Sequence, residues 1–266
     1  MEAKKLENNN GFGARVKALW SKNDMVSTLF ALLVMIIIQA IVMGTNAGSF
    51  GGMFGKMGMA WLNILRNNTY AGVIALGMCV IIISGGIDLS VGSMLCALGA
   101  ILMSLIEPTN GLLAGMGITG APAYASACAV IIAAGYVLGT LNGALVAYGK
   151  LPPFIATLGT MKIFRSVTQQ LTKNFNPKVP DGFKLIASAK IGGQVILPII
   201  YWLVIVVIMH IIFKKTAFGR QTIAIGSNER AAKLSGINVN RVKRHIYALG
   251  GVMCAVGAII YVSRIG

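Results

Sequence analysis

Charged residues are scarce in this sequence. Only 11% of its 266 residues are Asp, Glu, Lys or Arg, whereas about a quarter of the residues in soluble domains are charged. Apolar residues make up 56% of the chain, and apolar windows long enough to cross about 30 Å of hydrocarbon recur along it. This composition excludes a soluble protein and a single-span protein. It predicts an all-α, polytopic membrane protein with about seven membrane segments, one of them partial or re-entrant.

Residue types that carry chemistry are also few. The cysteines lie in apolar segments without a C-x-x-C pair, and the histidines lie far from other ligand-type residues. Neither a pair of carboxylates nor the G-x-x-x-x-G-K-[ST] loop that cradles ATP phosphates occurs. We therefore expect no catalytic residue, disulfide, metal site or bound cofactor in this chain. The residues concerned are Cys79, Cys96, Cys128, Cys254, His210 and His245.

Acidic residues are the rarest charged type, with 7 Asp and Glu against 23 Lys and Arg and a net charge of +16. The bases gather between apolar segments and do not interleave with aromatics, which favours topology determination and contact with lipid headgroups over nucleic-acid binding. Residues 1–24 form a basic leader and residues 214–244 a long basic connection, so both are predicted to be cytoplasmic. Residues 172–194 are then predicted to form an external loop. Their lysines run against the positive-inside rule, by which Lys and Arg favour cytoplasmic loops; they are Lys173, Lys178, Lys184 and Lys190.

Residues 25–266 are predicted to form one membrane domain in the cell membrane, entered from a cytoplasmic N-terminus. Residues 45–60 are rich in Gly and Met and show no clear pattern, so we expect a connection there. The second half of 154–171 is too polar to face lipid on all sides, so this segment should face the protein interior or cross only partly. The predicted segments are 25–44, 61–83, 91–106, 124–148, 154–171, 195–213 and 246–262.

The stretch 84–93, Ser-Gly-Gly-Ile-Asp-Leu-Ser-Val-Gly-Ser, joins two of these segments. Gly85 and Gly86 let the backbone leave helical geometry, and the hydroxyls of Ser90 and Ser93 can satisfy amides that such a break frees. We therefore predict a helix discontinuity here, around which the other segments pack.

Asp88 is the only acidic residue between Asp24 and Glu107. An unpaired carboxylate in hydrocarbon costs several kcal/mol, so it needs partners or a task. Span counting places Asp88 near the cytoplasmic ends of two helices, where it would cap the next helix at its positive end. The alternative is a titrating carboxylate of an ion-coupled transporter, although no intramembrane partner is evident. We favour the capping role.

Gly135, Gly139 and Gly143 are four residues apart in one predicted segment. Small residues at this spacing let a neighbouring helix approach backbone to backbone, so these glycines are predicted packing positions. Asn142 lies beside them. Either an interhelical hydrogen bond or contact with a polar solute would explain it.

The basic connection contains a predicted short helix. Asn228 is a good N-cap, Glu229 suits the positive end of a helix, and Gly236 is a natural stop. A helix of about two turns is unstable alone in water, so it should form by packing on something. The alternative is an ordinary amphipathic linker at the headgroups.

Three blocks in this order resemble permease subunits of monosaccharide ABC importers of the ribose/galactose/xylose branch. The first is the stretch 84–93, and the second is Pro-Phe-Ile-Ala-Thr-Leu-Gly-Thr-Met at 153–161. The third covers 218–237 and includes Asn-Glu-Arg-Ala-Ala-Lys-Leu-Ser-Gly-Ile from 228. Members of this family usually continue past an element like 263–266, so the chain is C-terminally short relative to the family.

The resemblance implies that two permease copies, identical or different, form a membrane pathway. A cytosolic ATPase, which binds ATP and Mg²⁺, would drive it, and an extracytoplasmic sugar-binding protein would deliver the substrate. The short helix would be the coupling element that docks on the ATPase, although Arg230 interrupts the Glu-Ala-Ala of looser kin. The residues at matching positions are Asn228, Glu229, Ala231, Ala232 and Gly236, and with Arg230 and Leu234 they form the predicted ATPase-coupling element.

The predicted function is therefore passive translocation of a simple sugar, without enzymatic activity in this chain. Such a pathway needs hydroxyl and amide partners rather than fixed charges, and it must bind weakly enough to release. The alternative is an ion-coupled secondary transporter that uses Asp88. The pathway candidates are Ser90, Ser93, Asn142, Thr157 and Thr160.

Overall fold

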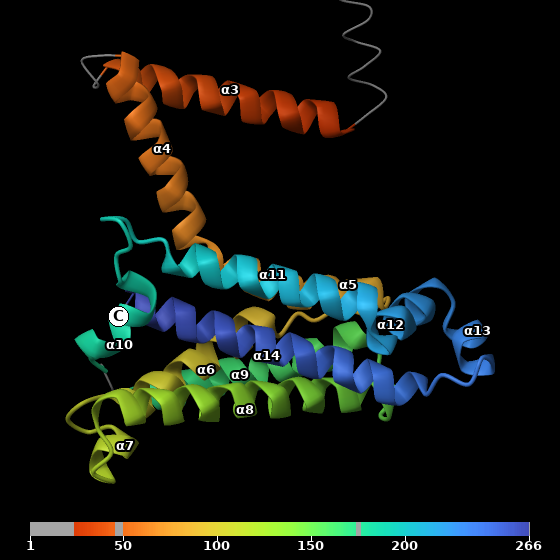
Figure 1. Cartoon of the computed structure of the whole chain (residues 1–266). Coiled ribbons are helices and arrows are strands. Elements are labelled where there is room, and N and C mark those ends of the chain that lie inside the picture. Colours follow the sequence, from red (N-terminus) through yellow and green to blue (C-terminus); the bar gives the residue numbers. More distant parts are fainter. Residues whose placement is uncertain (1–23, 46–49, 174–176, 266) are drawn as a thin grey trace, which may run out of the picture. The chain divides into compact units, whose positions relative to one another are not determined.

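The computed structural model of the chain describes residues 24–45, 50–173 and 177–265. This part of the chain is built of α-helices, apart from an isolated bridge between Ile191 and Gln194, so the all-α prediction is confirmed. The helices, labelled as in Figure 1, are α3 (Asp24–Thr45), α4 (Phe50–Asn67), α5 (Thr69–Ile83), α6 (Val91–Ile106), α7 (Leu112–Gly115), α8 (Gly120–Ala147), α9 (Pro153–Thr172), α10 (Asp181–Ser188), α11 (Leu197–Lys215), α12 (Ala217–Ser227), α13 (Glu229–Leu234) and α14 (Val239–Ile265).

Several of these helices are long and apolar enough to cross a membrane. In the described residues they are α3, α8, α11 and α14, and a fifth span results if the interrupted pair α4 and α5 counts as one. Helix α6 is apolar but shorter, at 16 residues. A polytopic membrane protein is thus confirmed, whereas the predicted total of segments stays a prediction.

The chain divides into two compact units, Met1–Ile64 and Leu65–Gly266. In the first unit, the prediction of an irregular connection over 45–60 is wrong, because α4 begins at Phe50. Met53, Met57, Ala60 and Ile64 recur at spacings of three or four residues. A helix of these residues therefore has an apolar face, which outweighs the low helix propensity of its glycines.

Helix α14 forms the core of the second unit. It packs against α8, α5 and α6. Of the apolar stretch of α14 that could cross a membrane, 72% is buried within the protein, compared with 28% for α8 and 11% for α11. Gly251, Ala255 and Ala258 lie in this helix. Such small side chains let neighbouring backbones approach, which is the main source of packing energy between helices in lipid.

The glycine seam (Gly135, Gly139 and Gly143 of α8) lies directly on α14. A methyl group on Gly135 would lie 2.5 Å from the carbonyl oxygen of Gly251, and one on Gly143 would lie 2.8 Å from Cα of Arg244. Both distances are far below the 3.4 Å at which ordinary van der Waals contact begins. The structure therefore places the predicted packing glycines where two backbones touch.

The predicted connections are more helical than expected. The loop 172–194 contains α10, the connection 214–244 contains α12 in addition to the predicted short helix α13, and α14 begins at Val239 rather than at 246. A hydropathy window detects the apolar part of a helix, and the polar turn around Arg241 and Arg244 continues the same helix beyond that part.

The two ends of the second unit carry different elements. Figure 1 shows α7 and α10 at one end and α13 at the other. The α5–α6 junction lies at the α13 end, since a Cβ on Gly226 of α12 would overlap the carbonyl oxygen of Ile83. The predicted external and cytoplasmic connections therefore lie at opposite ends, and which end faces the cytoplasm stays a prediction.

Candidate functional site

Residues 84–90, here called the break segment, separate α5 from α6. Gly85 has a φ of +80°, a left-handed conformation that favours glycine. A Cβ on Gly86 would lie 2.8 Å from the hydroxyl oxygen of Tyr247. The first glycine thus supplies backbone freedom and the second leaves room for α14.

Asp88 is buried in this segment, with 5% of its surface exposed. Its Oδ1 accepts hydrogen bonds from the backbone N–H of Ser90 at 2.8 Å and from the Ser90 hydroxyl at 2.6 Å. Nδ2 of Asn142 donates to Oδ2 at 3.4 Å. The expectation that Asp88 has no intramembrane partner is therefore wrong. Sequence reasoning missed the Asp88–Asn142 hydrogen bond because the two residues lie 54 positions apart, one in the break segment and the other on α8.

The position of Asp88 suits the start of α6. Ser90 occupies the formal N-cap position, and Asp88 binds the backbone amide of that residue. A carboxylate at a helix N-terminus is stabilised by the unpaired amides and by the positive end of the dipole. Asp88 therefore binds the amide of the N-cap residue from two positions before it, and its role as the cap of α6 stays a prediction.

Asn142 links the break segment to α8. Its Nδ2 donates to Oγ of Ser90 at 2.8 Å, so Asp88, Ser90 and Asn142 form one buried polar cluster. Of the two roles left open for Asn142, the structure shows the interhelical hydrogen bond. Its Oδ1 has no hydrogen-bond partner in the described part of the chain.

Helices α9 and α14 hold the break segment from two other sides. Oγ1 of Thr157 accepts a hydrogen bond from the backbone N–H of Leu89 at 3.2 Å. The hydroxyl of Tyr247 donates to the carbonyl oxygen of Ile87 at 3.2 Å. Thr160 is buried and donates to the carbonyl oxygen of Thr157 at 3.2 Å. Tyr247 was not among the predicted residues, since a tyrosine in an apolar segment carries no signal of a distant partner.

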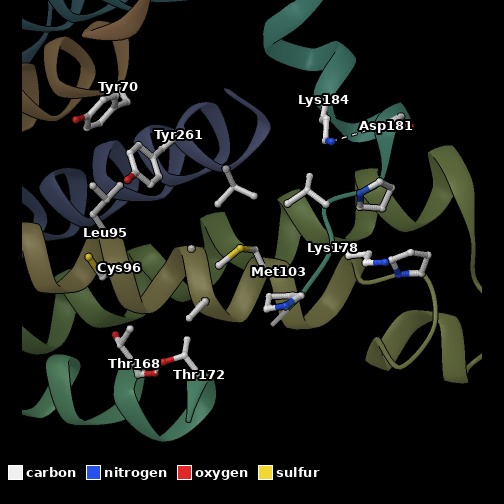
Figure 2. A pocket seen from close by; sticks show the side chains of 17 residues that line it. Tyr70, Leu95, Cys96, Met103, Thr168, Thr172, Lys178, Asp181, Lys184 and Tyr261 are labelled. Carbon is white, nitrogen blue, oxygen red and sulfur yellow. Dashed lines mark hydrogen bonds and ion pairs between the residues drawn. The ribbon is translucent and has the colours of Figure 1, made fainter. Parts of the chain in front are cut away.

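A cavity of about 1000 Å³ lies beside α6, between Tyr70 and Tyr261 on one side and Thr168 and Thr172 on another (Figure 2). It does not contain the predicted pathway residues. Ser90 of the break segment is buried, as are Asn142, Thr157 and Thr160, and Ser93 lies in the first turn of α6. The structure therefore brings Ser90 and Asn142 into one polar cluster with Asp88, and a role of the predicted residues in a pathway stays a prediction.

Helix α13 projects from the opposite end of the bundle from α10. Oδ1 of Asn228 accepts the backbone N–H of Ala231 at 3.0 Å, and Gly236 ends the helix at a φ of +84°. Glu229 pairs with Lys243 of α14 at 2.7 Å.

The faces of α13 differ sharply in exposure. Ala232 is buried, whereas Arg230 and Ala231 are exposed and Leu234 is 90% exposed. The helix thus rests on the bundle through one small side chain and presents an apolar side chain outward.

Taken together, the described residues define an all-helical, polytopic membrane protein in which the break segment separates α5 from α6. A family model described as "Branched-chain amino acid transport system / permease component" matches residues 60–266. This is more than half of the chain, and the chain belongs to this family.

Curated relatives refine this result. The chain is 42% identical over 210 residues to the ribose import permease protein RbsC of Bacillus subtilis and 36% identical over 208 residues to that of Haemophilus influenzae, in both cases over 77% of this chain. It is 34% identical over 215 residues, again 77% of the chain, to the galactose/methyl galactoside import permease protein MglC of Salmonella typhimurium. The predicted kinship with ribose and galactose permeases is confirmed.

The chain spans only part of these relatives, namely 60% of the Bacillus protein, 61% of the Haemophilus protein and 63% of the Salmonella protein. No solved structure matches the chain.

Proposed function

We propose that the chain is a translocation subunit of an ABC importer for a simple sugar, and that it is not itself an enzyme. The relatives named as ribose and galactose permeases support the substrate class. ATP and Mg²⁺ would be bound by a partner ATPase, since the sequence lacks the loop that holds ATP phosphates.

Exposed Leu234 is the observation that carries this proposal. The helix α13 has six residues, and helices this short are unstable alone in water. Asn228 caps its first turn, Ala232 is buried against the bundle, and Glu229 pairs with Lys243 of α14, so these contacts favour one orientation of its exposed side. A pre-ordered helix with an outward leucine suits docking into a groove of another protein. We assign that groove to the cytosolic ATPase.

The remaining partners follow from the same assignment. A sugar-binding protein would dock at the end that carries α7 and α10, and a second permease copy would complete the pathway within the bilayer. The basic leader 1–24 would lie in the cytoplasm with α13. Selectivity for one sugar would rest largely on the binding protein.

Uptake of labelled ribose and galactose tests this proposal. The chain is expressed with a candidate ATPase and binding protein from the same genome, in cells that lack their own permease. We expect uptake that depends on ATP and persists when the proton gradient is dissipated. Uptake that survives ATP depletion but collapses with the proton gradient would instead favour the ion-coupled alternative that uses Asp88.

Leu234→Ser tests the docking helix. Burying a leucine side chain is worth about 1.5–3 kcal/mol, so the variant should bind the ATPase about 10- to 100-fold more weakly. The matched control is Leu185→Ser on α10, which is 60% exposed at the other end. Equal co-purification of the ATPase with both variants would refute the role of α13.

A further inference from the structure

The cavity beside α6 is lined by residues of α5, α6, α9, α10 and α14 and by the segments that follow α6 and precede α10. Its walls are mainly apolar and include Leu95, Met103, Val179 and Val262. Along α6, the lining extends from Leu95 to Met103, which is about 12 Å of helix. That length is a large part of the roughly 15 Å depth of hydrocarbon in one leaflet.

Two lysines lie at one end of this cavity. Lys178 and Lys184 line it beside Pro108, past the end of α6, whereas the two tyrosines lie toward the other end (Figure 2). Lys184 pairs with Asp181 at 3.1 Å, but the side chain of Asp181 is 97% exposed. Such a pair contributes little in water, so a phosphate oxygen can replace it without a large loss.

The same lysines are the ones that run against the positive-inside rule. Residues 172–194 contain four lysines and one acidic residue, Asp181. Neither translocation nor docking of an ATPase accounts for a basic segment at this end of the bundle. An anionic headgroup would account for it, since each nearby lysine strengthens binding to an anionic lipid surface.

We propose that the cavity binds one anionic phospholipid of the adjacent leaflet. Its phosphate contacts Lys178 and Lys184, and one acyl chain lies along α6 between Met103 and Cys96. A free sugar fits less well, because the charged groups are gathered at one end and the rest of the lining is mainly apolar, with hydroxyls only from Tyr70, Thr168, Thr172 and Tyr261. The proposal does not depend on the transport function, so either can fail without the other.

Native mass spectrometry of the purified full chain tests the headgroup contact. The protein is given equal amounts of phosphatidylglycerol and phosphatidylcholine with the same acyl chains. We expect preferential retention of phosphatidylglycerol, and a loss of about 10- to 30-fold in that preference in the double variant Lys178→Ala/Lys184→Ala. Lys190→Ala is the matched control, because Lys190 is exposed in the same segment and does not line the cavity.

The acyl-chain contact is tested by filling the cavity. Cys96 is exposed and lines the cavity, whereas Cys79 is equally exposed and does not. Cys96→Phe should therefore lower retention of both lipids, and Cys79→Phe should not, with helical circular dichroism as the check on folding. Equal retention of the two lipids by the unmodified chain, an unchanged double variant, or displacement of the lipid by millimolar ribose would each overturn the assignment.

Discussion

Gly139→Ala tests whether the α8–α14 contact holds the bundle together. A methyl group at this position would overlap the carbonyl oxygen of Tyr247 and would lie 3.0 Å from Cα of Ala248 and 3.1 Å from Cα of Gly251. All of these atoms belong to backbone, so no side chain can rotate away. Helix α14 must therefore retreat by a few tenths of an ångström or more along the seam.

The size of the effect follows from comparison with a second glycine. Gly159 lies in the interior of α9, and a Cβ there would meet nothing within 4 Å. Gly159→Ala should gain the helix propensity of alanine, about 0.5–1 kcal/mol. Gly139→Ala gains the same amount but loses about 1–3 kcal/mol to overpacking. The difference between the two variants isolates the steric term.

Unfolding in detergent, followed by circular dichroism, measures that difference. We expect a lower free energy of unfolding for Gly139→Ala than for Gly159→Ala. Retreat of α14 should also lengthen the hydrogen bond from Tyr247 to Ile87, so hydrogen exchange should increase in residues 84–90. If the two variants unfold alike and exchange in the break segment is unchanged, the packing argument is wrong.

Two further predictions concern the acidic residues. Asp88→Asn keeps an oxygen acceptor for Ser90, so its free energy of unfolding should be close to that of the wild type. Asp88→Ala leaves the partner groups of Ser90 and Asn142 unpaired and should lower the free energy of unfolding by about 1–3 kcal/mol. Equal destabilisation by both variants would show that the charge itself is needed. The backbone amide of Asn110 lowers the pKa of Glu107 below its usual value of 4.5. The Glu107 carboxylate should therefore make its full contribution to the free energy of unfolding above about pH 5, and this contribution should be lost as the pH falls through its lowered pKa. Glu107→Gln should then flatten the acid side of a curve of unfolding free energy against pH. An unchanged curve would contradict this.

Some elements could be predicted well from sequence because their causes are local. Asn228 caps α13 and Gly236 ends it, as expected from the side chain of one and the missing Cβ of the other. The discontinuity between α5 and α6 likewise follows from Gly85, whose positive φ is a property of a single residue.

The helix α4 and the first turns of α14 could not be predicted, because their local composition is typical of connecting segments. The helix α4 has a glycine-rich sequence, and its apolar face emerges only when every third or fourth residue is aligned. The polar first turns of α14 fall within the predicted connection 214–244, because hydropathy marks where a chain leaves the membrane and not where a helix begins or ends.

The sequence alone determined that this is a helical membrane protein, that its helices break between α5 and α6, and which glycines favour close packing. These properties depend on composition and on residues a few positions apart. Only the tertiary structure decided that Asn142, Thr157 and Tyr247 hold the segment around Asp88 from three different helices. It also separated these residues from the cavity beside α6. Hydrogen bonds between helices depend on how the helices pack, and that arrangement is a property of the whole bundle.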